Sequence, residues 1–248
     1  MSGRTDDTWR DPEMARKFLD EIAGAIPFEA EQLDIMKRLI RHQRAGVGSF
    51  LDIGCGNGIL AAAILEEYPD ARATLLDFSD IMLSAAEEKL SAHKGQARYI
   101  KSDYGDEALD EKLAEEVSGF DVIVSRFSIH HQTDQRKQQL YKEIFNLLAP
   151  GGIFINIEHV ASGSQWNKGL FEEYMIDYLY ASQRKKGTGR TREDIAREFR
   201  SRHDKDANIV ASIEKQCEWF RQIGFSDVDC SFRVFELAIF SGRRINSQ

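Results

Sequence analysis

The chain has 248 residues and a formal net charge of -8, with 42% hydrophobic and 30% charged residues. This length and balance are typical of one large soluble domain, and the acidic charge disfavours a nucleic-acid partner, whose phosphates favour a basic face. A charged N-terminus, the lack of a membrane-length apolar run and three cysteines without disulfide or metal-ligand spacing indicate a cytoplasmic protein with neither a membrane segment nor a metal site.

Two helices are expected before the first strand, within residues 1–45. Apolar residues recur at helical spacing over about 14–26 and again over 33–40, and Pro27 interrupts the pattern between them. We interpret residues 1–45 as a helical cover of the sheet. The first helix, with Trp9 nearby, is a candidate lid over a ligand site.

Residues 50–60 predict a buried strand, a tight turn and a helix. Glycine occupies every second position of the turn, where it allows φ > 0 and lets a ligand approach the bare backbone N–H groups. The dinucleotide pattern Gly-x-Gly-x-x-Gly does not fit, because Ile59 stands at the position of its third glycine. The candidate ligand-binding residues of this turn are Asp52, Gly54, Cys55, Gly56 and Gly58.

A short strand over residues 72–77 ends in Asp77, about twenty residues after the glycine turn. An acid at a strand end is often only a helix cap. Nucleotide-binding βαβ units, however, place a carboxylate for ribose hydroxyls at this distance from a glycine turn. We therefore interpret Asp77 as a ribose ligand, and Phe78 and Met82 of the following helix as further binding residues.

Two more strands are expected to end in candidate binding residues. Asp103 and Tyr104 follow the strand 97–101, and the nearly continuous apolar run 119–125 ends in Ser125 and Arg126. Such a run is typical of a strand buried on both faces. Ligands of open α/β sheets gather at these carboxyl ends, so we include all four residues in the predicted site.

The run Leu-Asp-Ile-Gly-Cys-Gly-Asn-Gly closely resembles the first motif of class I S-adenosylmethionine-dependent methyltransferases. Three further family landmarks follow in the expected order, namely Asp77, Asp103 and the Pro150-Gly151-Gly152 turn. The resemblance covers about residues 46–240. It implies S-adenosylmethionine as cofactor, S-adenosylhomocysteine as product, and adenine recognition by Asp103. It also implies an α/β fold, a doubly wound, mostly parallel sheet of seven strands whose last two form an antiparallel pair.

Residues of about 162–211 are not explained by the alternating strands and helices of the core, which we place in a domain over 46–248. A tyrosine-rich segment at 171–179 has helical apolar spacing, and a basic run precedes a second, charged helix around Ile195. We expect an inserted helical pair over the strand ends. Together with the N-terminal helix, it is a candidate cover for the cofactor and its substrate.

Acid–base chemistry is expected from histidine, because a hydroxyl or amine acceptor must lose a proton and neutral histidine suits that task near pH 7. His130 and His131 follow the fourth strand, and Glu158 and His159 end the fifth. Neighbours in an extended chain face opposite ways, so one of each pair should reach the pocket. We rank His130 first and Glu158 second as catalytic residues.

The sequence thus predicts a methyltransferase that acts on a small-molecule acceptor by in-line methyl transfer, as a monomer or homodimer. Two alternatives stay open. The helices after strand five and the ending at 219–225 also look like carboxy-S-adenosylmethionine synthases of transfer-RNA modification, which need an arginine for a carboxylate. Candidates for that arginine are Arg192, Arg197 and Arg200. The second alternative is a protein that binds the cofactor without catalysis.

Overall fold

The computed structural model describes residues 13, 19, 26–43, 46–106, 108–113, 119–202, 205 and 207–245. The strands are β1 Ser49–Ile53, β2 Arg72–Asp77, β3 Ala97–Lys101, β4 Phe120–Arg126, β5 Leu148–His159, β6 Ser226–Val234 and β7 Leu237–Arg243. The helices are α2 Glu29–His42, α3 Ile59–Glu67, α4 Asp80–Lys89, α5 Leu109–Lys112, α6 Asp134–Leu147, α7 Gln165–Lys185, α8 Arg192–Ser201 and α9 Ile213–Ile223. Two short 3-10 helices are η3 Ser91–His93 and η4 Ile129–His131.

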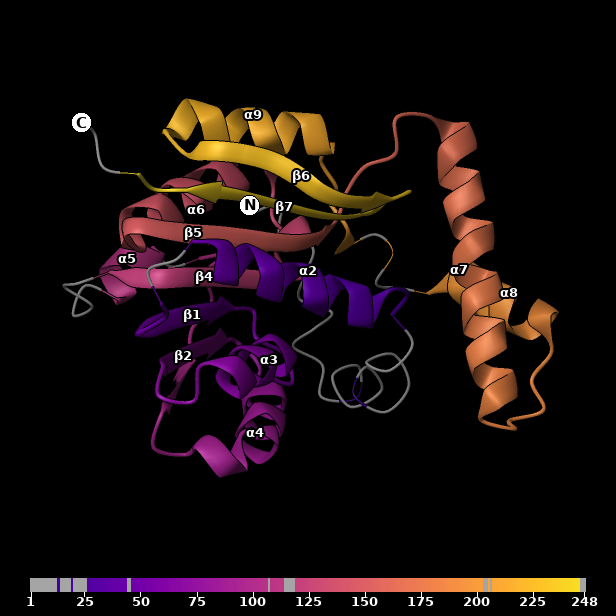
Figure 1. The fold of residues 1–248 in the computed structure, drawn as a ribbon. Coiled ribbons are helices and arrows are strands. Elements are labelled where there is room, and N and C mark those ends of the chain that lie inside the picture. The colour runs from indigo at the N-terminus through magenta and orange to yellow at the C-terminus, as the bar shows by residue number, and fades with distance from the viewer. Residues whose placement is uncertain are drawn as a thin grey trace.

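The strands form one sheet in the order β3-β2-β1-β4-β5-β7-β6 (Figure 1). β7 runs antiparallel to both β5 and β6, and the pairings from β3 through β5 are parallel. This confirms the predicted doubly wound, mostly parallel sheet and the antiparallel pair at its edge. No helix of the part of the chain that the structure describes is long and apolar enough to cross a membrane.

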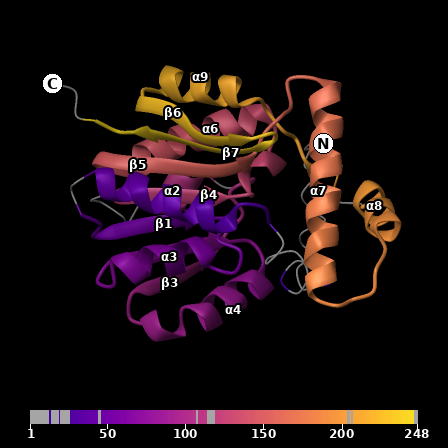
Figure 2. The same ribbon diagram turned by 45° about the vertical axis from the view of Figure 1, so that its right-hand side comes forward.

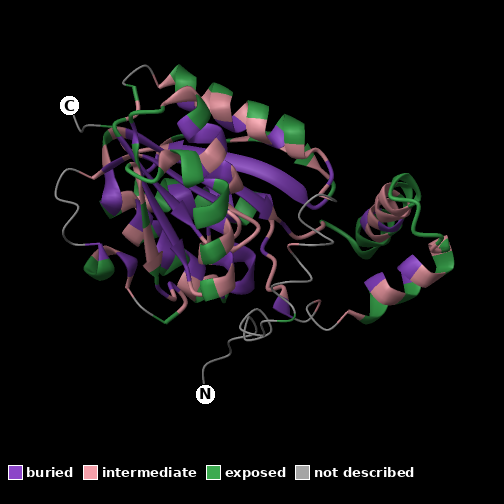
Figure 3. Ribbon diagram, turned by 90° about the horizontal axis from the view of Figure 1, so that it is seen from below, coloured by how far each residue is buried: buried purple, intermediate pink, exposed green. Residues whose placement is uncertain are grey.

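Helices pack on both faces of the sheet and bury its central strands. All five residues of β1 are buried. One core cluster joins the sheet to α6 and α9 around Tyr141 and Phe220, and the other joins it to α2, α3 and α4 around Met36 and Leu60. The central strands accordingly appear purple in Figure 3, whereas the outward sides of the helices are pink or green.

β5 is longer than the sequence predicts. We expected this strand to begin only after the Pro150-Gly151-Gly152 turn, but it begins at Leu148, which already pairs with Phe120. Gly152 lies within this extended segment. A Cβ atom there would lie 2.9 Å from the carbonyl oxygens of Ala149 and Phe120, so glycine is required for the two strands to approach.

The helices α7 and α8 form an arm beside the carboxyl ends of the parallel strands (Figures 1 and 2). They lie within the expected insertion at 162–211. α7 buries only Phe171 and Ile176, whereas Tyr174, Met175, Tyr178 and Leu179 of its predicted apolar face are partly buried. Ile176 packs on α8 next to Phe199, and the ring of Phe171 lies 5.7 Å from the ring of His159 on β5. The arm therefore has a small core of its own.

The predicted N-terminal cover corresponds in part to α2, whose buried residues include Met36 and Ile40. The predicted first helix, with Trp9, falls largely outside the described residues.

Candidate functional site

A cavity opens at the carboxyl ends of β1, β2 and β4. It holds about 890 Å³ of empty space, including its open mouth. The described residues that line it are Ile26, Asp52, Gly54, Cys55, Gly56, Asn57, Ile59, Leu60, Asp77, Phe78, Ser79, Met82, Tyr104, Arg126, Phe127, Ser128 and His131. The cavity therefore lies at the edge where open parallel sheets bind ligands.

The glycines between β1 and α3 have different tasks, although all three have positive φ. A Cβ atom on Gly54 would lie 1.9 Å from Oγ of Ser128, so this glycine allows two loops to touch. A Cβ atom on Gly56 would meet no atom within 4 Å, and Gly56 lines the cavity. Its bare backbone therefore faces the space that a ligand would fill. On Gly58 a Cβ atom would lie 3.1 Å from Cβ of Ala86, so this glycine serves helix packing.

Two buried acids stand beside the glycine turn. Asp77 accepts backbone N–H groups from Gly56 at 3.0 Å and from Ser79 at 2.9 Å, and burial raises its pKa to about 6. Burial also raises the pKa of Asp52 to about 7. Oδ2 of Asp52 has no hydrogen-bond partner among the described residues. A buried carboxylate oxygen normally has a partner, so this atom indicates a ligand group at the site.

Arg126 closes the cavity at the end of β4 and is held there by α2. Its NH1 and NH2 atoms each donate to Oε2 of Glu29 at 3.1 Å, and Nε donates to Oε1 of Gln32 at 3.3 Å. Burial lowers the pKa of Arg126, and the charge of Glu29 opposes that shift. The ion pair neutralises the guanidinium and ties α2 to the cavity wall.

The arm reaches the cavity wall through the segment just before α2. Ile26 lines the cavity, and the Tyr178 hydroxyl of α7 donates to its carbonyl oxygen at 3.4 Å. The rings of Phe28 and Tyr174 are stacked with their centroids 6.1 Å apart. None of the described α7 residues lines the cavity, so the arm contacts the wall without forming it.

Three of the predicted cofactor-binding residues lie off the cavity. Gly58 packs on Ala86, and the buried hydroxyl of Ser125 donates to the Ile53 carbonyl at 2.8 Å, between two strands. Asp103 is half-buried and accepts the backbone N–H of Gly105 at 2.9 Å. The remaining predicted residues, Asp52, Gly54, Cys55, Gly56, Asp77, Phe78, Met82, Tyr104 and Arg126, all line it.

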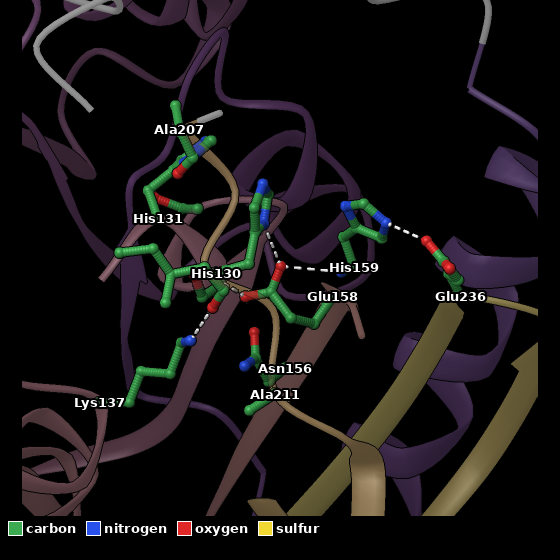
Figure 4. Close-up of polar contacts among 12 residues, drawn as sticks. His130, His131, Lys137, Asn156, Glu158, His159, Ala207, Ala211 and Glu236 are labelled. Atoms are coloured by element: carbon green, nitrogen blue, oxygen red, sulfur yellow. Dashed lines mark hydrogen bonds and ion pairs between the residues drawn. The ribbon is translucent and has the colours of Figure 1, made fainter. Parts of the chain in front are cut away.

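His130 and Glu158 form a buried pair (Figure 4). Nδ1 of His130 donates to Oε1 of Glu158 at 2.5 Å, and the His130 backbone N–H donates to Oε2 at 3.0 Å. The backbone N–H of His159 also donates to Oε1, at 2.9 Å. Burial lowers the pKa of His130 and raises that of Glu158 to about 7. The pair therefore has a histidine ring fixed by a carboxylate, an arrangement that orients a general base.

His131, and not His130, is the histidine that lines the cavity. We expected His130 to lie nearer the ligand, but the turn of η4 places it one layer behind, with its ring centroid 4.0 Å from that of His131. Nδ1 of His131 lies 3.1 Å from the carbonyl oxygen of Ala207. Since a carbonyl only accepts, Nδ1 carries the proton, and a neutral His131 therefore has its lone pair on Nε2.

Several cavity residues were missed from the sequence, among them Ile26, Phe127 and Ser128. Phe127 and Ser128 directly follow β4, whose carboxyl end we had already assigned to the site. Their position in the sequence could therefore have indicated that they line the cavity. Phe127 has φ of 48°, which an aromatic residue rarely adopts, and no sequence pattern indicates this. Ile26 reaches the cavity only because α2 packs across the sheet.

The three candidate arginines for a carboxylate lie on α8, and none of them lines this cavity. Arg192 binds Glu173 at 2.6 Å and Asp177 at 2.7 Å, and Arg200 binds Glu172 at 2.8 Å and Glu173 at 2.6 Å. These ion pairs join α8 to α7. The Arg197 side chain is largely exposed and lies 3.4 Å from Asp194 of its own helix.

The model of a methyltransferase domain family matches residues 50–152. Among curated proteins, the carboxy-S-adenosyl-L-methionine synthase of Nautilia profundicola is 24% identical over 230 residues, which cover 93% of this chain and 92% of that protein.

Solved methyltransferases have the same fold. The structure of PigF with SAH aligns with a TM-score of 0.60 and 20% identity, and covers 96% of this chain. Human N-acetylserotonin methyltransferase in complex with SAM aligns with a TM-score of 0.52 and 15% identity, and covers 99% of this chain. The chain spans 61% and 63% of the length of these two proteins. With the glycine turn, Asp77 and the sheet order in place, the chain has the fold of these methyltransferases, and its residues 50–152 match a methyltransferase domain family.

Proposed function

We propose that the cavity binds S-adenosylmethionine. The backbone of Gly56 leaves room for a ligand, and the unpartnered Oδ2 of Asp52 suits the ammonium group of its methionine part. Asp77 keeps acceptor capacity on both oxygens, which suits ribose hydroxyls. The apolar and aromatic residues that would surround the cofactor are Cys55, Phe78, Met82 and Tyr104.

The reaction we propose is in-line methyl transfer to a small-molecule acceptor. When bound, the cofactor supplies an electrophilic methyl group on a sulfonium. The protein's part is to position the acceptor and take up its proton, and positioning alone supplies up to about 7–11 kcal/mol in well-oriented reactions. A small acceptor suits a cavity whose wall includes Ile26, Phe127 and His131.

The observation that carries this proposal is the buried Glu158–His130 pair directly behind the cavity wall. Glu158 holds Nδ1 of His130, and the Asn208 side chain is a further hydrogen-bond partner of the same imidazole. In this proposal the pair takes up the proton that the acceptor loses, and His131 forms the cavity wall beside the acceptor.

The test is turnover, measured as release of S-adenosylhomocysteine when the protein is supplied with S-adenosylmethionine and a panel of small hydroxyl and amine acceptors. Acceptor-dependent release that His130→Ala reduces supports the proposal. Tight cofactor binding without release for any acceptor supports a binding protein instead.

A second candidate function is synthesis of carboxy-S-adenosylmethionine. The observation in its favour is the likeness to a synthase of that name across nearly the whole chain. Arg192 and Arg200, two of the arginines considered for a carboxylate, already pair with acids of α7. Incubation with S-adenosylmethionine and prephenate distinguishes the two functions, because the synthase yields a carboxylated cofactor by mass spectrometry and the methyltransferase does not.

A further inference from the structure

Lys137 of α6 is a buried lysine with none of its surface exposed. Its ammonium group donates to the carbonyl oxygen of Ile209 and lies 3.5 Å from Oδ1 of Asp134. Lysine is almost never fully buried without a compensating charge. Asp134 is a poor compensation, because it is partly exposed and also binds Lys215 at 2.7 Å.

Glu158 is the second carboxylate that acts on Lys137, and it is fully buried. Burial lowers the pKa of Lys137, and Glu158 is the charged group that opposes this shift most strongly. Lys137 in turn opposes the burial that raises the pKa of Glu158. The two residues come from α6 and β5, and Figure 4 shows the lysine pointing toward the His130–Glu158 pair.

A short strap, residues 207–211, connects the lysine to both histidines of η4. The Ile209 backbone N–H donates to the His130 carbonyl at 2.9 Å, while the Ile209 carbonyl accepts from Lys137. The Ala207 carbonyl accepts from Nδ1 of His131. Lys137 thus contacts the same peptide segment that fixes the backbone of His130.

Glu158, whose pKa burial raises to about 7, is ionised above that pH. In its ionised form it accepts three N–H donors, two from His130 and one from His159. The other titratable groups whose charges act on Glu158, His130 or Lys137 are His131, Asp134, His159, Arg202 and Lys215, and Glu158 in turn acts on Tyr141.

We propose that Lys137 is a positioning residue whose buried charge keeps Glu158 ionised, so that His130 keeps its proton on Nδ1 and its lone pair on Nε2. Lys137 does not line the cavity and does not touch the acceptor. Its catalytic consequence rests on the acid–base role proposed for His130, but the charge coupling itself does not.

The test is the titration of His130 in the ligand-free protein, followed by NMR with labelled histidine and assigned by the signal missing from His130→Gln. Lys137→Gln removes the charge but keeps an N–H donor for the Ile209 carbonyl. Because Lys137 favours proton loss from both members of the pair, we expect this variant to take up the proton at a pH about one unit higher. Lys137→Arg keeps the charge and should titrate like the parent protein.

Lys215→Met is the matched control, since it removes a largely exposed positive charge beside the same Asp134. It should leave the midpoint of His130 in place. An unchanged midpoint in folded Lys137→Gln overturns the proposal, and Lys137→Met gives the same test if the glutamine variant does not fold. The titration needs no acceptor, so its result stands apart from that of the turnover assay. If turnover is found, the acidic limb of its pH–rate profile should lie at higher pH in Lys137→Gln than in the parent protein. In Lys137→Arg it should lie at the same pH as in the parent protein.

Discussion

The backbone N–H of Gly56 donates to Oδ2 of Asp77 at 3.0 Å, although the two residues lie 21 positions apart. The hydrogen bond makes the glycine turn and the end of β2 one structural unit. The carboxylate is positioned by backbone groups from Gly56 and Ser79 before any ligand arrives. Such preorganisation lowers the entropic cost of ligand binding.

Asp77→Ala should weaken S-adenosylmethionine binding about tenfold or more, because a charge-assisted hydrogen bond contributes roughly 1.5–3 kcal/mol. Calorimetry measures the dissociation constant, and circular dichroism checks that the variant is folded. Asp80→Ala serves as the control, since Asp80 is an exposed acid three residues away on α4. Equal affinity in the parent and Asp77→Ala would rule out Asp77 as a ribose ligand.

Gly56→Val should abolish cofactor binding, because the new side chain would enter the open space of the cavity. The substitution also strains the backbone, since φ of Gly56 is +51°. Gly187→Val separates the two effects. Gly187 has φ of +68° and no atom within 4 Å of a built Cβ, but it lies in the loop after α7. Calorimetry should find normal binding in this control, and loss of binding there would mean that strain alone explains the result at Gly56.

The stability of the ligand-free protein should fall as the pH rises toward neutrality. Burial raises the pKa of Asp77 to about 6 and those of Asp52 and Glu158 to about 7, so the folded state holds protons that the unfolded chain has already lost. Their stabilising contribution is complete below the unfolded pKa values of about 4 and disappears as the pH rises through about 6 to 7. Thermal unfolding at pH 5.5 and 7.5 measures this difference.

Asp52→Asn should flatten that dependence, because it removes a carboxyl group that is buried without a full set of partners. We expect the melting temperature of the variant to change less between pH 5.5 and 7.5 than that of the parent. An equally steep dependence in Asp52→Asn would show that Asp52 does not titrate in this range.

His130→Ala should lower the turnover rate about 10²–10⁴-fold, the usual contribution of a general base, while changing S-adenosylmethionine affinity little. His131→Ala is the informative comparison, because His131 lines the cavity and His130 stands behind it. Steady-state kinetics across pH measures both variants. If His131→Ala loses the rate and His130→Ala keeps it, the proton goes to the wall histidine and the buried pair is structural.

The sheet could be read from the sequence because its signals are local. The apolar strand β4 and the glycine turn before α3 each appear in a few adjacent residues, and chain order then determines which strand ends meet. For the same reason Asp77 and Tyr104, both at strand ends, were placed correctly on the cavity wall.

Other features of the site depend on contacts between segments that are far apart in sequence. Ile26 lines the cavity because Arg126 binds Glu29 and thereby brings the start of α2 to β4. We expected His130 to lie nearer the cavity than His131. This was wrong because η4 turns the chain after β4, whereas we assumed an extended strand. Lys137 was not singled out from the sequence, since its burial follows from its contact with the 207–211 strap.

Whether the chain uses S-adenosylmethionine as a methyl donor can be seen from the intact mass of the ligand released from the purified protein. We expect S-adenosylmethionine or S-adenosylhomocysteine, with much less ligand released from Asp77→Ala. Release of the carboxylated cofactor would contradict methyl transfer and favour the synthase, and failure to retain either expected compound, even after incubation with S-adenosylmethionine, would contradict the cofactor assignment itself.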